Sequence, residues 1–178
     1  MITLSKNECR IVDFLIRHFN SHYTIRNIAK ELKISPAGAQ KSLKKLESEK
    51  IVIPERIGTA VVYSVDFHNK VAKHLSTFIL SQDFTEKIPD ELSKIKKYAL
   101  LAIRLEKEIL LISTIGNTSR IRELSSNLIE YNPVIQLIDE FNKNLAGFDK
   151  KIIEFIRSGT ILWGEYHLVR SIKDRGIP

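Results

Sequence analysis

The sequence predicts an α+β protein in which a helical N-terminal part with a β-hairpin precedes a smaller α/β part. Apolar residues recur at helical spacing from Ile11 to Leu46. The period then changes to that of strands in "IVI" and "VVYSV", which flank "PERIGTA". After Gln82 to Pro89, which reads as a linker, apolar runs of strand length alternate with helical patterns. We therefore expect domains at 1–82 and 90–178.

Composition and charge limit the classes of function. The chain has 178 residues, 43% of them hydrophobic, and a formal net charge of +7. This charge is compatible with a polyanionic partner. The single cysteine, Cys9, rules out a disulfide within the chain and indicates a reducing compartment, where we expect it to be a packing residue. The apolar runs are too short to cross a bilayer, so we expect a cytoplasmic protein that does not enter the membrane.

The ends of the first three helices are marked by capping residues. Ser5 and Glu8 have the spacing of a capping box, in which each side chain accepts a hydrogen bond from the other residue's amide. Thr24 is expected to cap the second helix. Ser35 is expected to cap the third, with Pro36 at its first position, where a missing N–H costs nothing. In the third helix an apolar stripe faces the core, and it consists of Ala39, Leu43 and Leu46.

Three helices followed by a two-stranded hairpin form the order of a winged helix-turn-helix. The break between the second and third helices is three or four residues long, as that motif requires. In such a fold the third helix enters the major groove of DNA and its N-terminal residues reach the base edges. We expect 36–47 to be this recognition helix. We expect the wing, 54–60, to lie on the adjacent backbone or minor groove.

Side-chain chemistry gives each candidate residue a role at this interface. Gln40 can pair with adenine in two places, and Lys41 and Lys44 can reach guanine or phosphate. Lys45, nearer the edge of the face, is expected on the backbone. Other candidates would hold phosphate at a helix start, allow close approach of the backbone, or contact DNA from the wing. The full set is Thr24, Arg26, Ser35, Ala37, Gly38, Gln40, Lys41, Lys44, Lys45, Arg56 and Thr59.

The N-terminal sequence "YTIRNIAKELKISPAGAQKSLKKLESEKIVIPERIGTAVVYSV" resembles the winged-helix domain of MarR/ArsR-like prokaryotic transcriptional regulators. It is closest to the archaeal type, whose wing ends as Gly58 to Asp66 do here. In many proteins of that type a minimal nucleotidyltransferase-like domain follows. "PVIQLIDEFNKNL" and "IIEFIRSGTILWGEYHLV" are similar to the end of such a domain. The resemblance implies a degenerate nucleotidyltransferase-like fold for the second part.

The residues that an active nucleotidyltransferase needs are missing. Such an enzyme uses a Gly-Ser turn to cradle the triphosphate and two carboxylates, one residue apart, to hold Mg²⁺. Here the segment from Tyr98 to Thr114 offers Glu106 and Glu108, which we interpret as turn residues of a hairpin. Periodicity leaves this segment open between two strands and a buried helix. The turn from Ile115 to Arg120 could hold an anion before a helix, but we favour a plain turn.

The favoured hypothesis is a transcriptional regulator that binds double-stranded DNA as a homodimer, without enzymatic activity, cofactor or metal. The helix from Asn69 to Leu80 is apolar along one side and is a candidate for part of the dimer interface, although the same stripe could pack on its own domain. Two alternatives stay open at this point. One is a nucleotidyltransferase targeted by a winged helix, and the other is a winged-helix adaptor that contacts proteins.

Overall fold

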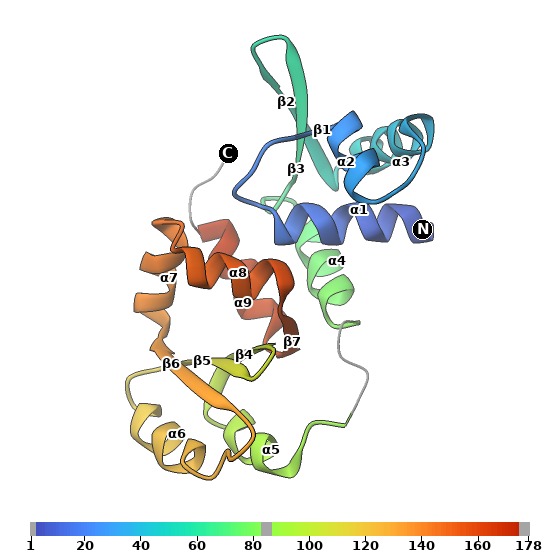
Figure 1. Ribbon diagram of the computed structural model, residues 1–178. Coiled ribbons are helices and arrows are strands. Elements are labelled where there is room, and N and C mark those ends of the chain that lie inside the picture. Colours follow the sequence, from blue (N-terminus) through green and yellow to red (C-terminus); the bar gives the residue numbers. More distant parts are fainter. Residues whose placement is uncertain (1–2, 83–86, 175–178) are drawn as a thin grey trace. The chain divides into compact units, whose positions relative to one another are not determined.

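The computed structural model describes residues 3–82 and 87–174, and the expected linker falls partly outside this range. The chain divides into two compact units, residues 1–79 and 80–178, which we call unit 1 and unit 2 (Figure 1). Within the described residues, no helix combines the length and the apolar character that crossing a membrane requires.

The three predicted N-terminal helices are present in unit 1. They are α1 (Lys6–Arg17), α2 (Ile25–Glu31) and α3 (Pro36–Ser48). The predicted capping box is confirmed, because the Ser5 amide donates to Glu8 Oε2 at 2.8 Å and the Glu8 amide donates to Ser5 Oγ at 3.4 Å. The Thr24 and Ser35 caps are confirmed as well. Four residues, 32–35, separate α2 from α3, within the predicted length.

The predicted hairpin forms the wing, from β2 (Val52–Ile57) and β3 (Ala60–Val65). Figure 1 shows it projecting from the three helices of unit 1. Gly58 opens the two-residue turn with φ +59°, a conformation that glycine adopts at little cost. A further short strand, β1 (Tyr23–Thr24), pairs with β3, giving the order β1-β3-β2. Pro54 lies in β2, at the sheet edge, where its missing donor is tolerated.

Lysines in the left-handed conformation end both helices of the helix-turn-helix. Lys33 and Lys50 have φ of +53° and +55°. After α2 the amides of Lys33 and Ile34 donate to the carbonyls of Lys30 and Ala29, and the same pattern follows α3, where the Ile51 amide donates to the Leu46 carbonyl at 2.8 Å. These are Schellman motifs, which usually place glycine at the left-handed position. They turn the chain sharply toward α3 and then toward the wing.

The core of unit 1 is made by one face of each helix and by the base of the wing. Helix α3 packs on both α1 and α2. The predicted stripe of α3 is confirmed as buried. The largest fully buried residues of this core are Ile11, Ile16, Ile28, Leu43, Leu46 and Ile51. Helix α4 (Lys70–Leu80) follows the wing, as the periodicity after Asn69 predicts.

Unit 2 is a mixed four-stranded sheet with helices on both faces. The strands are β4 (Ala99–Leu105), β5 (Glu108–Ser113), β6 (Asn132–Leu137) and β7 (Thr160–Trp163), in the order β6-β5-β4-β7. Only the β5–β6 pair is parallel within the described residues, and α6 (Thr118–Ser125) connects it. Figure 1 shows α5 (Asp90–Lys96) and α6 on one side of the sheet, opposite α7 (Ile138–Ala146), α8 (Lys150–Ser158) and α9 (Glu165–Asp174).

The structure decides what periodicity left open in Tyr98 to Thr114. The segment is an antiparallel hairpin, β4 and β5, with alternate side chains packed on opposite faces of the sheet. On the α5–α6 face the core consists of Leu92, Ile95, Ala99, Ala102, Ile109, Leu111, Ile121, Leu128, Leu162 and Trp163. The predicted strands and helices from Thr118 to Trp163 are present, and the charged group around Lys94 lies on a helix, α5, as expected, whereas α9 was not predicted. Helix α9 has ten residues and buries Leu168, Val169 and Ile172.

We predict that Lys50→Gly stabilises unit 1 by about 1 kcal/mol, because glycine removes the cost of a left-handed side chain at the end of α3. Lys30→Gly is the matched control. It also replaces an exposed lysine, but in a right-handed helical position, and should destabilise by about 1 kcal/mol. Amide hydrogen exchange at Leu43 and Leu46 would measure both changes in unit 1. Destabilisation by both substitutions would contradict the prediction.

Candidate nucleic-acid interface

The exposed face of α3 carries the side chains expected to read DNA. Because a helix turns by about 100° per residue, burial of Ala39, Leu43 and Leu46 directs the opposite side outward. On that outward side Gln40, Lys41 and Lys44 are exposed. The sequence has no acidic residue from Ile34 to Leu46, so the N-terminal part of this face is free of opposing charge. The face therefore combines hydrogen-bonding and cationic groups within two turns of one helix.

The start of α3 offers fewer hydrogen-bonding groups for a phosphate than the sequence suggests. Ser35 Oγ accepts from the Gly38 amide at 3.0 Å, and the Ser35 carbonyl accepts from the Ala39 amide at 2.9 Å. Pro36 has no amide hydrogen. Among the first-turn amides that the structure describes, that of Ala37 is left for a phosphate. A Cβ at Gly38 would approach Ser35 Oγ to 3.0 Å, so the small residue suits the cap itself.

The remaining candidates lie on α2 and on the wing. Thr24 Oγ1 accepts from the Asn27 amide at 3.3 Å, so this hydroxyl is engaged in the cap of α2. Arg26, in the first turn of α2, is exposed. At the other side of the motif Arg56 and Thr59 are exposed near the tip of the wing. Unit 1 thus presents cationic side chains on α3, on α2 and on the wing.

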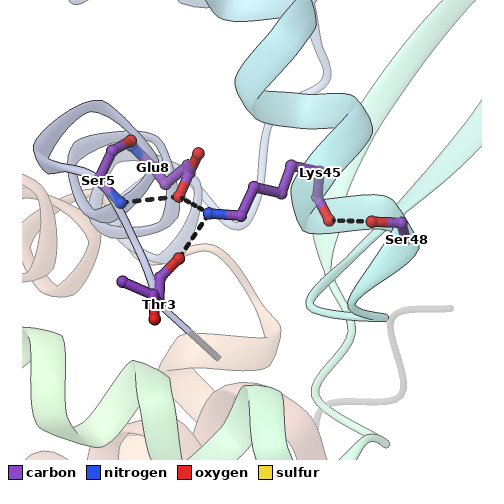
Figure 2. Close-up of polar contacts among 5 residues, drawn as sticks. All are labelled: Thr3, Ser5, Glu8, Lys45 and Ser48. Atoms are coloured by element: carbon purple, nitrogen blue, oxygen red, sulfur yellow. Dashed lines mark hydrogen bonds and ion pairs between the residues drawn. The ribbon is translucent and has the colours of Figure 1, made fainter. Parts of the chain in front are cut away.

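Lys45 has partners that the sequence did not indicate. Figure 2 shows its ammonium between the N-terminal segment and α1, where it contacts Glu8 Oε2 at 2.9 Å and donates to the carbonyl of Thr3. The Lys45 side chain is 42% exposed, whereas that of Glu8 is 8% exposed. The sequence indicated Glu8 only as a capping residue. Glu8 and Lys45 lie far apart in the chain, and no local pattern links them.

The hydrogen bonds of Glu8 hold its carboxylate in the charged form. Burial by itself raises the pKa of Glu8, but the bond from the Ser5 amide and the contact with Lys45 lower it, and the net pKa lies below the ordinary value. Burial and the Glu8 carboxylate together raise the pKa of the half-buried Cys9 thiol. A raised pKa keeps this thiol protonated at neutral pH, which agrees with the expected role of Cys9 as a packing residue.

The acidic pair of unit 2 lies at the β4–β5 turn, and one of its carboxylates has a lysine partner. The prediction of a hairpin turn is confirmed for Glu106, which lies in the β4–β5 turn with φ +53°. It is wrong for Glu108, which begins β5 and pairs with Leu105 across the turn. Lys151 Nζ contacts Glu108 Oε1 at 2.6 Å, so the ammonium group occupies the position beside this carboxylate that a metal ion would take. In the described part of the chain, no three His, Cys, Asp or Glu side chains gather as metal ligands would.

The turn before α6 uses its polar groups internally, as a plain turn does. Asn117 Nδ2 donates to the Tyr98 carbonyl at 3.2 Å, and Thr118 Oγ1 donates to the Thr114 carbonyl at 3.0 Å. Arg120 contacts Glu123 at 2.6 Å. Asn117 occupies the N-cap position, but its side chain makes no capping bond to the helix. These contacts favour the plain turn over an anion site.

About half of the chain is similar to proteins of known structure. The zinc-responsive MarR family member ZitR of Lactococcus lactis is 25% identical, over 54% of this chain and 71% of that one, with a TM-score of 0.35. Wild-type ZitR in complex with DNA is 28% identical, over 54% and 70%, also with a TM-score of 0.35. MepR, a transcription regulator of the Staphylococcus aureus multidrug efflux pump MepA, is 15% identical, over 53% and 73%, with a TM-score of 0.40.

No protein-family model matches the chain, and no curated protein matches it. The similar structures include MarR-family regulators, but TM-scores this low do not establish a shared fold. The comparisons give no support to the expected likeness between unit 2 and a nucleotidyltransferase, which stays a prediction.

Glu8→Gln should destabilise unit 1 by about 1 kcal/mol at neutral pH, because it removes the negative charge from the hydrogen bond between Glu8 and Lys45. The effect is modest because Lys45 is partly exposed and water screens the contact. The pKa of Glu8 is lowered by folding, so its contribution is present above the unfolded value of about 4.3 and is lost as the pH falls through the folded value. The difference between wild type and variant should therefore shrink below about pH 4. Denaturant unfolding across this pH range checks this, with the exposed Glu31→Gln as control. A difference independent of pH would contradict it.

Proposed function

We propose that unit 1 binds double-stranded DNA with α3 in the major groove, and that the chain is a transcriptional regulator. The observation that carries the proposal is the outward face of α3, where Gln40, Lys41 and Lys44 are exposed above a buried apolar stripe. A single helix fits the major groove, and these are side-chain types that bind base edges and phosphates there. The packing of the core thus determines which face of the proposed recognition helix is exposed.

The roles within the interface follow from the positions of the side chains. Gln40 lies near the helix start, where it would read adenine, and Lys41 and Lys44 would contact guanine or phosphate. Ala37 and Gly38 would let the helix start approach the backbone. Residues on α2 and the wing would contact flanking phosphates or the minor groove, and these are Thr24, Arg26, Ser35, Arg56 and Thr59. We leave Lys45 out of this set because Glu8 and Thr3 hold its ammonium.

We propose no catalytic role for unit 2, whether or not its fold is nucleotidyltransferase-like. Two carboxylates on one strand could share a magnesium ion, but Glu106 lies in the turn and Glu108 is paired with Lys151. Transfer of a labelled nucleotide that depended on Glu108 would contradict this proposal. The same result would revive the reading of unit 1 as a targeting module for an enzyme.

The chain should bind random-sequence duplex DNA with an affinity that falls as salt rises. Replacing Gln40, Lys41 and Lys44 by alanine removes two cations from the face of α3, so the slope of log affinity against log salt should become shallower by about two units. Fluorescence anisotropy at about 50 and 200 mM salt would measure the slopes.

The matched control is Lys94→Ala with Lys143→Ala, which removes the same charge from exposed positions of unit 2. It should keep the wild-type slope. Equal losses in both variants would mean that affinity follows total charge rather than the face of α3. Wild-type protein that does not bind at the lower salt concentration would favour a protein-interaction adaptor instead.

We also propose that the chain binds DNA as a homodimer, because two recognition helices on one duplex gain affinity over one. Helix α4 exposes Val71 and Phe78 on one face, at 47% and 59%. Sedimentation should give the mass of two chains, and Val71→Ser with Phe78→Ser should shift it toward one. Lys70→Ser on the same helix is the control and should leave the mass unchanged. A wild-type mass of one chain would contradict the dimer.

A further inference from the structure

The lysines of α3 fall into two groups according to their contacts. Lys41 and Lys44 are exposed on the outward face of the helix. Lys45 contacts Glu8 Oε2 at 2.9 Å and donates to the Thr3 carbonyl, as Figure 2 shows. At about 100° per residue, Lys45 lies only about 40° around the helix from Lys41. Its four-carbon stem lets the ammonium reach either the α1 side or the DNA side of α3.

The two partners in this contact differ in freedom. The Glu8 carboxylate is 8% exposed and is fixed by the Ser5 amide, which donates to it at 2.8 Å. Lys45 is 42% exposed, so it is the partner that could leave. Its departure toward a phosphate would strand a charged carboxylate in a buried position, which is strongly unfavourable. The carboxylate therefore competes with DNA for the same ammonium from a site that DNA does not reach.

We propose that Glu8 withholds Lys45 from DNA, so that Glu8 sets the number of phosphate contacts made by α3 without touching DNA itself. This inference rests on the proposed binding of DNA by unit 1. Glu8 acts through Lys45 and is a positioning residue. When Glu8 is ionised, Lys45 stays at the start of α1 and the face of α3 binds with Lys41 and Lys44. When the charge of Glu8 is removed, Lys45 becomes available as a further phosphate contact.

The test is a cycle of three variants, Glu8→Gln, Lys45→Gln and the double variant, each compared with wild type in binding random-sequence duplex DNA. Glutamine at Glu8 keeps an oxygen that can accept from the Ser5 amide, and glutamine at Lys45 keeps an N–H donor on a side chain one bond shorter than lysine. The measured quantity is the slope of log affinity against log salt at neutral pH. Circular dichroism and thermal unfolding establish that each variant is folded at the temperature of the assay.

Glu8→Gln should steepen the slope by about one unit, which makes affinity fall about 3.5-fold further between 50 and 200 mM salt than in wild type. Lys45→Gln alone should leave the slope unchanged, since Lys45 does not contact DNA while Glu8 is charged. The double variant should return to the wild-type slope, because the added contact belongs to Lys45. This reversal separates a new contact by Lys45 from a general effect of removing a negative charge.

Two results would overturn the inference. A slope about one unit shallower in Lys45→Gln would mean that Lys45 already contacts phosphate in wild type. An unchanged slope in folded Glu8→Gln would mean that Glu8 caps α1 but does not keep Lys45 from DNA. If Glu8→Gln is unfolded in the assay, Lys45→Gln alone is the test: an unchanged slope is the expected result, and a shallower slope contradicts the inference. Failure of the proposed function looks different, because wild type would then show no salt-sensitive binding or would keep its slope when Lys41 and Lys44 are replaced.

Discussion

The burial of the apolar stripe of α3 is the constraint on which unit 1 depends. Ala39, Leu43 and Leu46 are fully buried, and α3 packs on both α1 and α2. A rotation of α3 about its axis would expose at least one of these side chains, and removing a leucine from water is worth roughly 1.5 to 3 kcal/mol. The same constraint fixes the direction of Gln40, Lys41 and Lys44. The geometry of the candidate interface is therefore a consequence of core packing.

The ends of the helices add precision to this arrangement. Ser5, Thr24 and Ser35 fix where α1, α2 and α3 begin, and the left-handed residues Lys33 and Lys50 fix where α2 and α3 end. Each end satisfies backbone groups that would otherwise be unpaired. Because the turn between α2 and α3 is only four residues long, small changes in either end would displace α3. Capping chemistry thus links local sequence to the presentation of the exposed side chains of α3.

Much of unit 1 could be predicted from the sequence because its signals are local. A capping residue acts within three positions, and the apolar stripe of α3 repeats every three or four residues. The hairpin was predictable because β-branched runs flank Gly58. In unit 2, periodicity could not decide the segment from Tyr98 to Thr114, since a strand buried on both faces lacks alternation. The structure shows a hairpin, and the helices that cover both faces of its sheet account for the unbroken apolar runs.

The pairing of Glu8 with Lys45 was beyond sequence reasoning because it depends on the crossing of two helices rather than on spacing within one. The pairing of Glu8 with Lys45 also bears on how a winged helix would balance affinity for DNA against specificity for its sequence. Phosphate contacts strengthen binding to every sequence about equally, whereas base contacts discriminate among sequences. A regulator must find few sites among many competing ones, so a cation that contacts only phosphate raises the background along with the signal. Holding Lys45 on a buried carboxylate would lower that background while leaving Gln40 free to read a base.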